Sequence, residues 1–460
     1  MSGDRGDHPS REVLERFLLA QLPASEGSRV LRHLLAGCPG CQETAGEMWQ
    51  HAPGAQRQPA VLDAELELRY DEVLDRVFKR VEIAERSIAR ERATARELLA
   101  TLEKHPIERQ RMLLRNSQRF RSPALCEQLI EASHHAGFAD PGRARELAEI
   151  ALELVSSLDS EDALGLSAIQ NLESRAWAQL ANARRVSGDL AGAEEAFERA
   201  DRSLCRDGAG LFEEARLCDL KASLRKEQRR FPEALCLHDR VIAIYQSLGQ
   251  RHLLGRAYTQ KAMVINEIGD YDSAIALLRS ALELLDPKEE PRVFLVARHN
   301  LIWSLCESER YREAFALLFH TRPYYLQGGD RMNLLRMRWL EGNVSAGLGR
   351  AEQAEVAYRE VGQAFGELGL DYDGALVALD LAILYARQGR APEVRRIARE
   401  ILDVFNARGI HREAIAAIAL LYQAAEREQA RVTLVRRVSS FLKRARSDHE
   451  IRFQLEDDAS

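Results

Sequence analysis

The sequence predicts an all-α protein built mainly as an α-solenoid, in which helix pairs stack into a right-handed superhelix. Three observations lead to this prediction. A motif recurs along the chain at intervals of 40 or 41 residues. Apolar residues on both sides of each motif recur at the spacing of amphipathic helices. Ala, Leu, Glu and Arg dominate the composition, and these residues lose little side-chain freedom in a helix.

Length and charge narrow the possibilities further. The chain has 460 residues and a formal net charge of −6. That length suits two or three domains or one extended array, and the small charge gives no overall attraction to nucleic acid or anionic lipid. The sequence lacks both a run of about 18 apolar residues and a secretion signal. We therefore expect a cytoplasmic protein that makes no membrane contact.

Residues 8–50 are predicted to form a small helical module. Two amphipathic helices are expected, over Ser10–Gln21 and Ser25–Leu35, with the two serines as N-caps. Their apolar faces make a core far smaller than the cores that normally hold a separate domain together. The module therefore needs a further source of stability.

A metal ion is the candidate for that source. His33, Cys38 and Cys41 follow the pattern H-x4-C-x2-C, in which the Cys-x-x-Cys turn presents two thiolates to one ion. His8 is the only nearby residue suited to complete a tetrahedral set, which would bind structural zinc because it leaves no open coordination position. Two alternatives remain: a module without zinc whose thiols are free, and a redox Cys-x-x-Cys, which would need a preceding strand.

The stretch LPASEGSRVLRHLLAGCPGC resembles the zinc-finger module of zinc-binding anti-sigma factors, with His33, Cys38 and Cys41 on the ligand positions. The pattern departs from that family in two places. His8 stands where a cysteine is usual, and the gap between His33 and Cys38 is one residue longer. The resemblance implies that the module and the following helix contact a sigma factor or another regulator and occlude the surfaces of sigma that bind RNA polymerase.

A linker and a charged helical connector follow, over residues 51–61 and 62–121. The connector is expected to hold one long helix over Leu62–Glu103 and a second over roughly Glu108–Arg121. The basic run Arg109–Arg121 is a candidate phosphate-contacting face, and nucleic-acid binding through it is one functional alternative. More often such a run is a solvated helix face that pairs with acidic neighbours.

The repeat array is predicted over residues 122–447, followed by an acidic tail over 448–460. Gly269 illustrates one unit: it lies where a helix C-cap needs a positive φ, and Asp270 can cap the next helix. Ala274 is small enough to let the two antiparallel helices approach closely. The residues at the position of Gly269 in six successive units are Gly188, Arg229, Gly269, Glu309, Gly349 and Gly389.

This pattern resembles the tetratricopeptide repeat. The first unit carries matching residues on the signature packing positions of that family: Trp177, Leu180, Ala181, Gly188, Ala193, Phe197 and Ala200. The usual unit is shorter by about six residues, and extra length in the second helix and the connecting loop accounts for the difference. The resemblance implies a concave groove, lined by the first helix of each unit, that binds a protein or a peptide.

Side chains that lie off the packing stripe of these first helices are the candidate partner-binding residues. Asparagine amides can hydrogen-bond to the backbone of a ligand, and aromatic rings can anchor its side chains. The candidates are Asn182, Arg185, Met263, Asn266, Asn300, Trp303, Trp339 and Asn343. The alternatives are ordinary repeat packing for the tryptophans and solvated surface for the asparagines.

The sequence favours a binding protein over an enzyme, because it lacks the phosphate-loop, dinucleotide-loop, H-E-x-x-H and G-x-S-x-G signatures. The favoured function is a cytoplasmic regulator or adaptor, whose zinc module contacts a sigma factor or another regulator while the array binds a second protein. The alternative is a scaffold of a multi-protein effector system, in which the module serves assembly alone.

Overall fold

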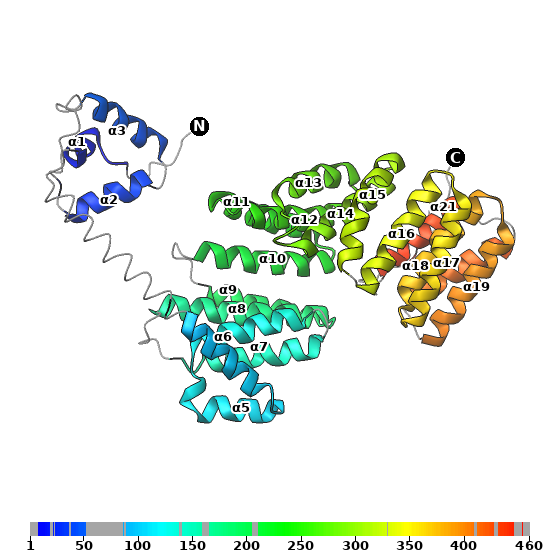
Figure 1. Cartoon of the computed structure of the whole chain (residues 1–460), viewed down its shortest axis with the longest axis horizontal. Helices are drawn as coiled ribbons and strands as arrows, with labels where there is room; N and C mark the ends of the chain where they lie inside the picture. The colour runs from blue at the N-terminus through cyan, green and yellow to red at the C-terminus, as the bar shows by residue number, and fades with distance from the viewer. Residues whose placement is uncertain are drawn as a thin grey trace. The chain divides into compact units, whose positions relative to one another are not determined.

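In the part of the chain that it describes, the computed structural model consists of helices joined by turns and short connections (Figure 1). It describes residues 8–18, 22, 24–35, 38–51, 86, 89–137, 140–158, 165–204, 210–328, 330–408, 412–426, 431–445 and 453. None of these residues lies in a β-strand, which confirms the all-α prediction. The predicted linker after His51, the predicted helix as far as residue 85, and the predicted tail apart from Phe453 lie outside the described residues.

The chain divides into two units, residues 1–90 and 91–460. Unit 1 contains helices α1 (Arg11–Leu18), α2 (Ala24–Leu35) and α3 (Pro39–His51). The first two correspond to the helices predicted for this module. Its core is small, with Leu14, Val30 and Cys41 as the buried members of one apolar cluster.

Helix α3 is a feature that the sequence analysis did not predict. Pro39 begins it, and proline suits the first helical position because its missing N–H has no partner there in any helix. Gly40, Gly46 and several polar residues weaken its apolar periodicity, so the pattern that predicts helices elsewhere is faint here.

Unit 2 begins within the helix over residues 89–102, which is followed by α5 (Ile107–Asn116) and the 3-10 helix η1 (Gln118–Phe120). The predicted helix over roughly Glu108–Arg121 therefore ends earlier than expected. Ala95, Leu98 and Leu102 are buried in one cluster with residues of the first array helices.

The remaining helices pack in sequence, each against the next, as stacked pairs joined mostly by short turns (Figure 1). The first helices of successive pairs also contact one another: α6 with α8, α8 with α10, α12 with α14, α14 with α16, and α16 with α18. Together these contacts form the predicted solenoid of unit 2. Its helices are α6 (Pro123–Ala136), α7 (Pro141–Val155), α8 (Gly165–Val186), α9 (Leu190–Ser203), α10 (Leu211–Glu227), α11 (Phe231–Ser247), α12 (Arg251–Ile268), α13 (Tyr271–Leu284), α14 (Pro291–Glu307), α15 (Tyr311–Gly328), α16 (Arg331–Gly347), α17 (Ala351–Glu367), α18 (Asp371–Arg387), α19 (Ala391–Arg408), α20 (Arg412–Glu426) and α21 (Val432–Ala445).

The turn inside each pair has the same geometry. The six residues at the position of Gly269 all have a positive φ: Gly188 (85°), Arg229 (57°), Gly269 (93°), Glu309 (58°), Gly349 (76°) and Gly389 (72°). Asp270 caps the following helix, because its Oδ1 accepts a hydrogen bond from the backbone N–H of Ser273 at 3.2 Å. The turn geometry is thus kept even at Arg229 and Glu309, where a Cβ makes this conformation unfavourable.

An alanine lies at the crossing of the two helices in five of the pairs, and Val394 holds the equivalent position in the sixth. Ala193, Ala234, Ala274, Ala314 and Ala354 recur with the period of the repeat, and all five are completely buried. Their size lets the paired backbones approach closely. None of the described helices combines the length and the apolar character that crossing a membrane requires.

We predict opposite effects for two glycine-to-alanine substitutions. In Gly349→Ala, the added Cβ meets open space but must adopt a left-handed φ, so stability should fall by about 1–2 kcal/mol. In Gly366→Ala, which lies within α17 and also faces open space, stability should rise by about 0.5–1 kcal/mol. Thermal unfolding of both variants tests this, and a lower melting temperature for both would contradict it.

Candidate metal centre and ligand pocket

The four predicted metal ligands come together in unit 1. The ligand atoms of His8, His33, Cys38 and Cys41 all lie within 4.8 Å of one another. His8 immediately precedes α1, His33 lies near the end of α2, and the two cysteines lie at the start of α3. A group of two histidines and two cysteines in this arrangement can hold a metal ion.

The separations between His8 and the other three ligand atoms fit tetrahedral coordination. His8 Nδ1 lies 3.3 Å from His33 Nε2, 3.4 Å from Cys38 Sγ and 3.6 Å from Cys41 Sγ. Bond lengths to zinc of about 2.0–2.1 Å for nitrogen and about 2.3 Å for sulfur place tetrahedral ligand atoms about 3.3 Å apart for two nitrogens and about 3.6 Å for nitrogen and sulfur. One ring nitrogen cannot hydrogen-bond to three partners at once, whereas convergence on a shared ion accounts for all three distances.

The chemistry of Cys41 is consistent with a need for a cation. Burial, followed by the neighbouring Cys38, raises the pKa of the Cys41 thiol. Without a positive charge nearby, the thiolate is therefore unfavourable at this position. A metal ion supplies that charge and favours the deprotonated thiolate as a ligand.

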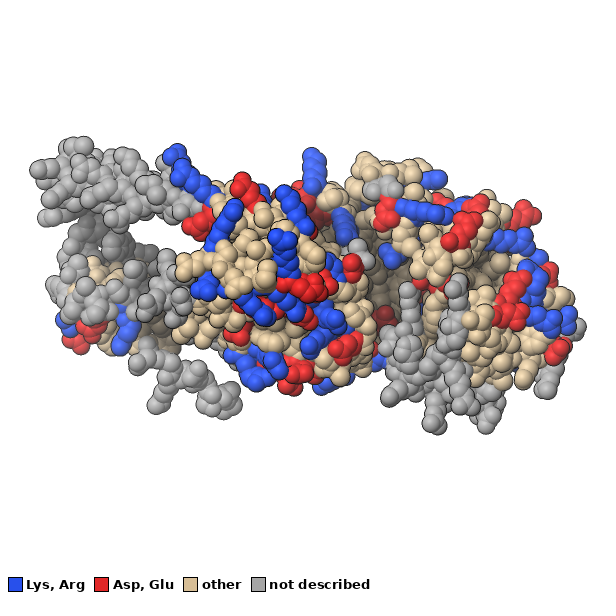
Figure 2. Space-filling view, turned by 90° about the horizontal axis from the view of Figure 1, so that it is seen from below, with Lys and Arg blue, Asp and Glu red and all other residues tan. Residues whose placement is uncertain are grey.

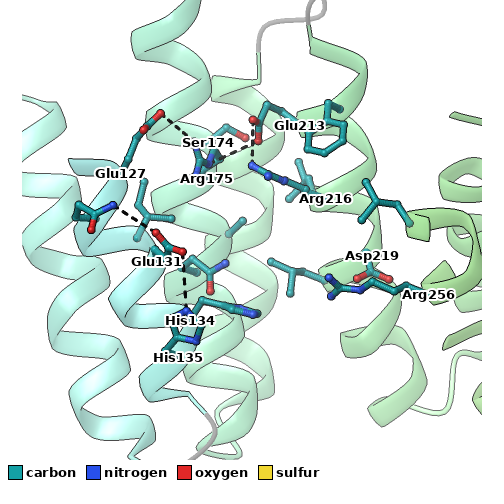
Figure 3. A pocket seen from close by; sticks show the side chains of 18 of the residues that line it. Glu127, Glu131, His134, His135, Ser174, Arg175, Glu213, Arg216, Asp219 and Arg256 are labelled. Atoms are coloured by element: carbon teal, nitrogen blue, oxygen red, sulfur yellow. Dashed lines mark hydrogen bonds and ion pairs between the residues drawn. The ribbon is translucent and has the colours of Figure 1, made fainter. Parts of the chain in front are cut away.

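An open pocket lies on the first helices of the N-terminal half of unit 2 (Figure 3). We call it the N-terminal pocket. Its volume is about 830 Å³, and its lining comes mainly from the helix over 89–102 and from α6, α8, α10 and α12. Apolar side chains such as Ile130, Leu217 and Leu253 form part of the lining, together with several charged residues.

Ion pairs link neighbouring helices around this pocket. Arg175 of α8 lies 3.6 Å from Glu127 of α6 and 3.7 Å from Glu213 of α10. Arg216 pairs with the same Glu213 at 3.3 Å, and its guanidinium carbon lies 4.6 Å from the centre of the Phe212 ring. These charged side chains therefore hold one another in position along the wall (Figure 3).

Five of the predicted partner-binding residues lie on α8, α12 and α14, beside this pocket or farther along the array. Arg185 donates hydrogen bonds to Asn182 and to Glu227, so Asn182 and Arg185 already engage each other. Met263 is half-buried. Asn266 is buried, and its Oδ1 accepts a hydrogen bond from Ser304 at 2.9 Å. The side-chain amide of Asn300 donates to the carbonyl of Val296 in its own helix.

The other predicted residues lie near α21, the last described helix of the chain. Lys443 of α21 lies 3.6 Å from Glu307 and 5.7 Å from the ring centre of Trp303, both on α14. Trp339 donates a hydrogen bond to Asp380 at 2.7 Å, and Asn343 accepts one from Tyr358 at 2.8 Å. A partner-binding role for these residues stays a prediction.

Helix α21 packs against α18 and α20 and reaches back to α14. It buries Val435, Val438, Phe441 and Leu442 in the C-terminal core. A second pocket, of about 220 Å³, lies between α21 and residues of α14, α16 and α18. In this half of unit 2, a helix of the chain itself therefore covers part of the inner surface.

The basic run Arg109–Arg121 has acidic partners. Arg111 lies 2.6 Å from Glu149 and 3.2 Å from Glu153, and Arg115 lies 3.0 Å from Glu153. On the face of unit 2 drawn in Figure 2, basic and acidic side chains are interspersed. Both observations agree with a solvated helix face that pairs with its neighbours.

The sequence analysis did not identify the N-terminal pocket. On α10, Phe212, Glu213, Arg216 and Asp219 line it. They recur at the three- and four-residue spacing that places side chains on one face of a helix. Ala215 and Ala222 lie beside this stripe, on the packing face, and are completely buried. A charged and aromatic stripe next to the small packing residues was the signal available in the sequence.

No protein-family model matches the sequence, and no curated protein matches it. Among solved structures, the chain is similar to aspartyl phosphate phosphatase F from Bacillus subtilis, with 13% identity, a TM-score of 0.46 and 99% of both chains covered. It is also similar to a Rap protein complexed with competence and sporulation factor, with 12% identity, a TM-score of 0.44, and 71% of this chain and 99% of that chain covered. The apo form of RapI is a third similar structure, with 13% identity, a TM-score of 0.42, and 68% of this chain and 98% of that chain covered. Likeness at this level carries no argument about function.

Proposed function

We propose that this protein is a protein-binding adaptor of the cytoplasm, not an enzyme, and that a peptide segment of its partner binds in the N-terminal pocket. The observation that carries the proposal is the pocket itself, about 830 Å³ in volume and lined by four first helices in succession. Its size is within the range of sites that bury a ligand.

The lining of the pocket suits a peptide. Apolar side chains can receive the apolar side chains of a ligand, and ionised groups around them can hydrogen-bond to its backbone and polar side chains. Basic and acidic groups alternate around the pocket, which favours a segment of mixed charge over a nucleic-acid backbone, which is uniformly negative.

For unit 1 we propose structural zinc, held by His8 Nδ1, His33 Nε2 and the thiolates of Cys38 and Cys41. Two nitrogens and two sulfurs in a closed tetrahedral set are typical of structural zinc sites. The small core explains the need for the ion, since Leu14 and Val30 are its only buried aliphatic side chains among the described residues of the cluster.

The resemblance of this module to anti-sigma factors supports a finer proposal, that it contacts a sigma factor. In this proposal unit 1 holds the regulator and unit 2 holds the second partner. The structural basis is the ligand arrangement of His33, Cys38 and Cys41 on the end of one helix and the start of the next.

We predict that reversing one charge in the pocket abolishes partner capture. In Arg216→Glu, the new carboxylate faces Glu213, so the recovery of partners from the native host should fall about tenfold or more. Arg240→Glu is the matched control, because Arg240 is similarly exposed (52% against 47%) and pairs with Glu214 away from the pocket. Quantitative mass spectrometry of captured proteins measures both, and equal recovery would contradict the pocket as the binding site.

We predict that the purified protein contains about one zinc ion per chain and that His8 is one of its ligands. His8→Ala should lower the zinc content and the melting temperature of unit 1, whereas His8→Cys should retain both because a thiolate can replace the imidazole. The control is His320→Ala, an exposed histidine of α15. Full zinc content in His8→Ala, measured by elemental analysis, would show that His8 is not a ligand.

For the sigma-factor proposal, we expect a sigma factor to be recovered with the wild-type protein and not with the variant Cys38→Ser/Cys41→Ser, because the module loses its metal. Recovery of subunits of an effector system in place of a sigma factor would favour the scaffold alternative. The absence of any sigma factor from the wild-type capture would contradict this part of the proposal and leave the pocket proposal standing.

A further inference from the structure

Three of the arginines that line the N-terminal pocket pair with carboxylates. Arg175 lies between Glu127 and Glu213, and Arg216 also pairs with Glu213. Arg256 of α12 pairs with Glu290 at 3.6 Å, outside the pocket lining. Burial lowers the pKa of His134, so this histidine adds no positive charge at neutral pH. An anionic ligand would therefore have to displace a carboxylate in order to pair with any of these three arginines.

Two carboxylates of the lining, Glu131 and Asp219, form no ion pair with a lysine or an arginine among the described residues. Each lies 3.9 Å from a histidine, His135 for Glu131 and His238 for Asp219. Asp219 of α10 is the more enclosed of the two, with its side chain 32% exposed against 61% for Glu131. Arg256 lies close enough to lower its pKa, but burial outweighs this effect and raises the pKa overall.

The neighbours of Asp219 on α11 are uncharged. Burial lowers the pKa of His238 to about 4, so its imidazole is neutral at physiological pH. Burial and the carboxylate of Asp219 raise the pKa of Tyr245 to about 12, so the phenol is neutral too. Asp219 is thus partly exposed in the pocket, where Arg256 lies beside it without forming an ion pair with it (Figure 3).

We infer that Asp219 anchors a positively charged side chain, a lysine or an arginine, of the peptide that occupies the N-terminal pocket. This inference rests on the proposed function and names the chemistry of its ligand. A cation at this position donates charge-assisted hydrogen bonds to a carboxylate that lacks them. It also relieves the cost of a charge enclosed by protein. The aromatic rings of Phe212 and Tyr245, 6.0 Å apart in the same pocket, can contact the aliphatic part of the side chain.

The test uses the full-length protein and a randomised library of cysteine-free heptapeptides, from which binding sequences are selected. The selected peptides should contain a lysine or an arginine at one fixed place. A double-mutant cycle then combines Asp219→Asn with replacement of that cationic residue by glutamine in the peptide, with affinities measured by fluorescence anisotropy.

Asp219→Asn should weaken binding of the cationic peptide roughly ten- to hundredfold, because it removes the charged acceptor. The same variant should change the affinity of the glutamine peptide by less than about twofold. Asp219→Glu keeps the charge and should retain intermediate affinity, which separates loss of charge from damage to the fold. The matched control is Asp239→Asn, on α11 and paired with Lys261 outside the pocket lining, and it should bind like the wild type.

The outcomes distinguish the two proposals. If peptides bind and Arg216→Glu abolishes their binding, but they show no cationic preference or no dependence on Asp219, the inference is wrong and the proposed function stands. If the library yields no binder to the wild-type protein, both are overturned. Non-additive effects of Asp219→Asn and the peptide substitution support the direct contact.

Discussion

The fold of unit 2 depends on the stacking of its helix pairs, because a single pair cannot bury its own apolar faces. The alanines at the helix crossings set the distance at which this burial takes place. Ala193, Ala234, Ala274, Ala314 and Ala354 have no exposed surface, and a larger side chain at any of them would have to push two helices apart. Each helix pair contacts mainly the pairs before and after it, so the same distance between helices recurs along the array. The first helices of successive pairs therefore lie beside one another.

The stacking of the helices also determines which side chains stay accessible to a ligand. In the N-terminal half of unit 2 the first helices present an open pocket of about 830 Å³. In the C-terminal half, α21 fixes four large apolar side chains in the core and brings Lys443 to Glu307 of α14. Burial of such side chains is worth about 1.5–3 kcal/mol each. Helix α21 is therefore an integral part of the fold that leaves only a space of about 220 Å³ beneath it, and ligand binding is more readily accommodated at the other end.

The repeat was predictable from the sequence, because packing alanines and turn residues recur every 40 residues whatever the array encloses. Even Arg229 and Glu309 take the positive φ that their position in the period demands. The cluster of candidate metal ligands was predictable because Cys38 and Cys41 are only three positions apart in the sequence, and His33 lies near the end of the preceding helix. The pocket was not, since it brings together side chains of α6 and α12 more than 100 residues apart, such as Glu127 and Arg256. Contacts of α21 with Trp303 depend in the same way on how the whole array curves, which no local pattern encodes.

The ion pairs along the wall of the N-terminal pocket add little to the stability of the fold, which indicates that they serve another role. Ion pairs such as that of Arg175 with Glu127 are spaced at 3.6 to 3.7 Å, longer than a good charge-assisted hydrogen bond, and partly exposed pairs of this kind add little stability. Apolar residues in the same places would stabilise the array at least as well. For the proposed ligand, what the pairs provide is orientation: the guanidinium groups of Arg175 and Arg216 are held along the wall in advance, which lowers the entropy lost on binding. Asp219 has no such partner and is less exposed than Glu131, the other lining carboxylate without a lysine or arginine partner, so a cationic ligand group improves its electrostatic environment more.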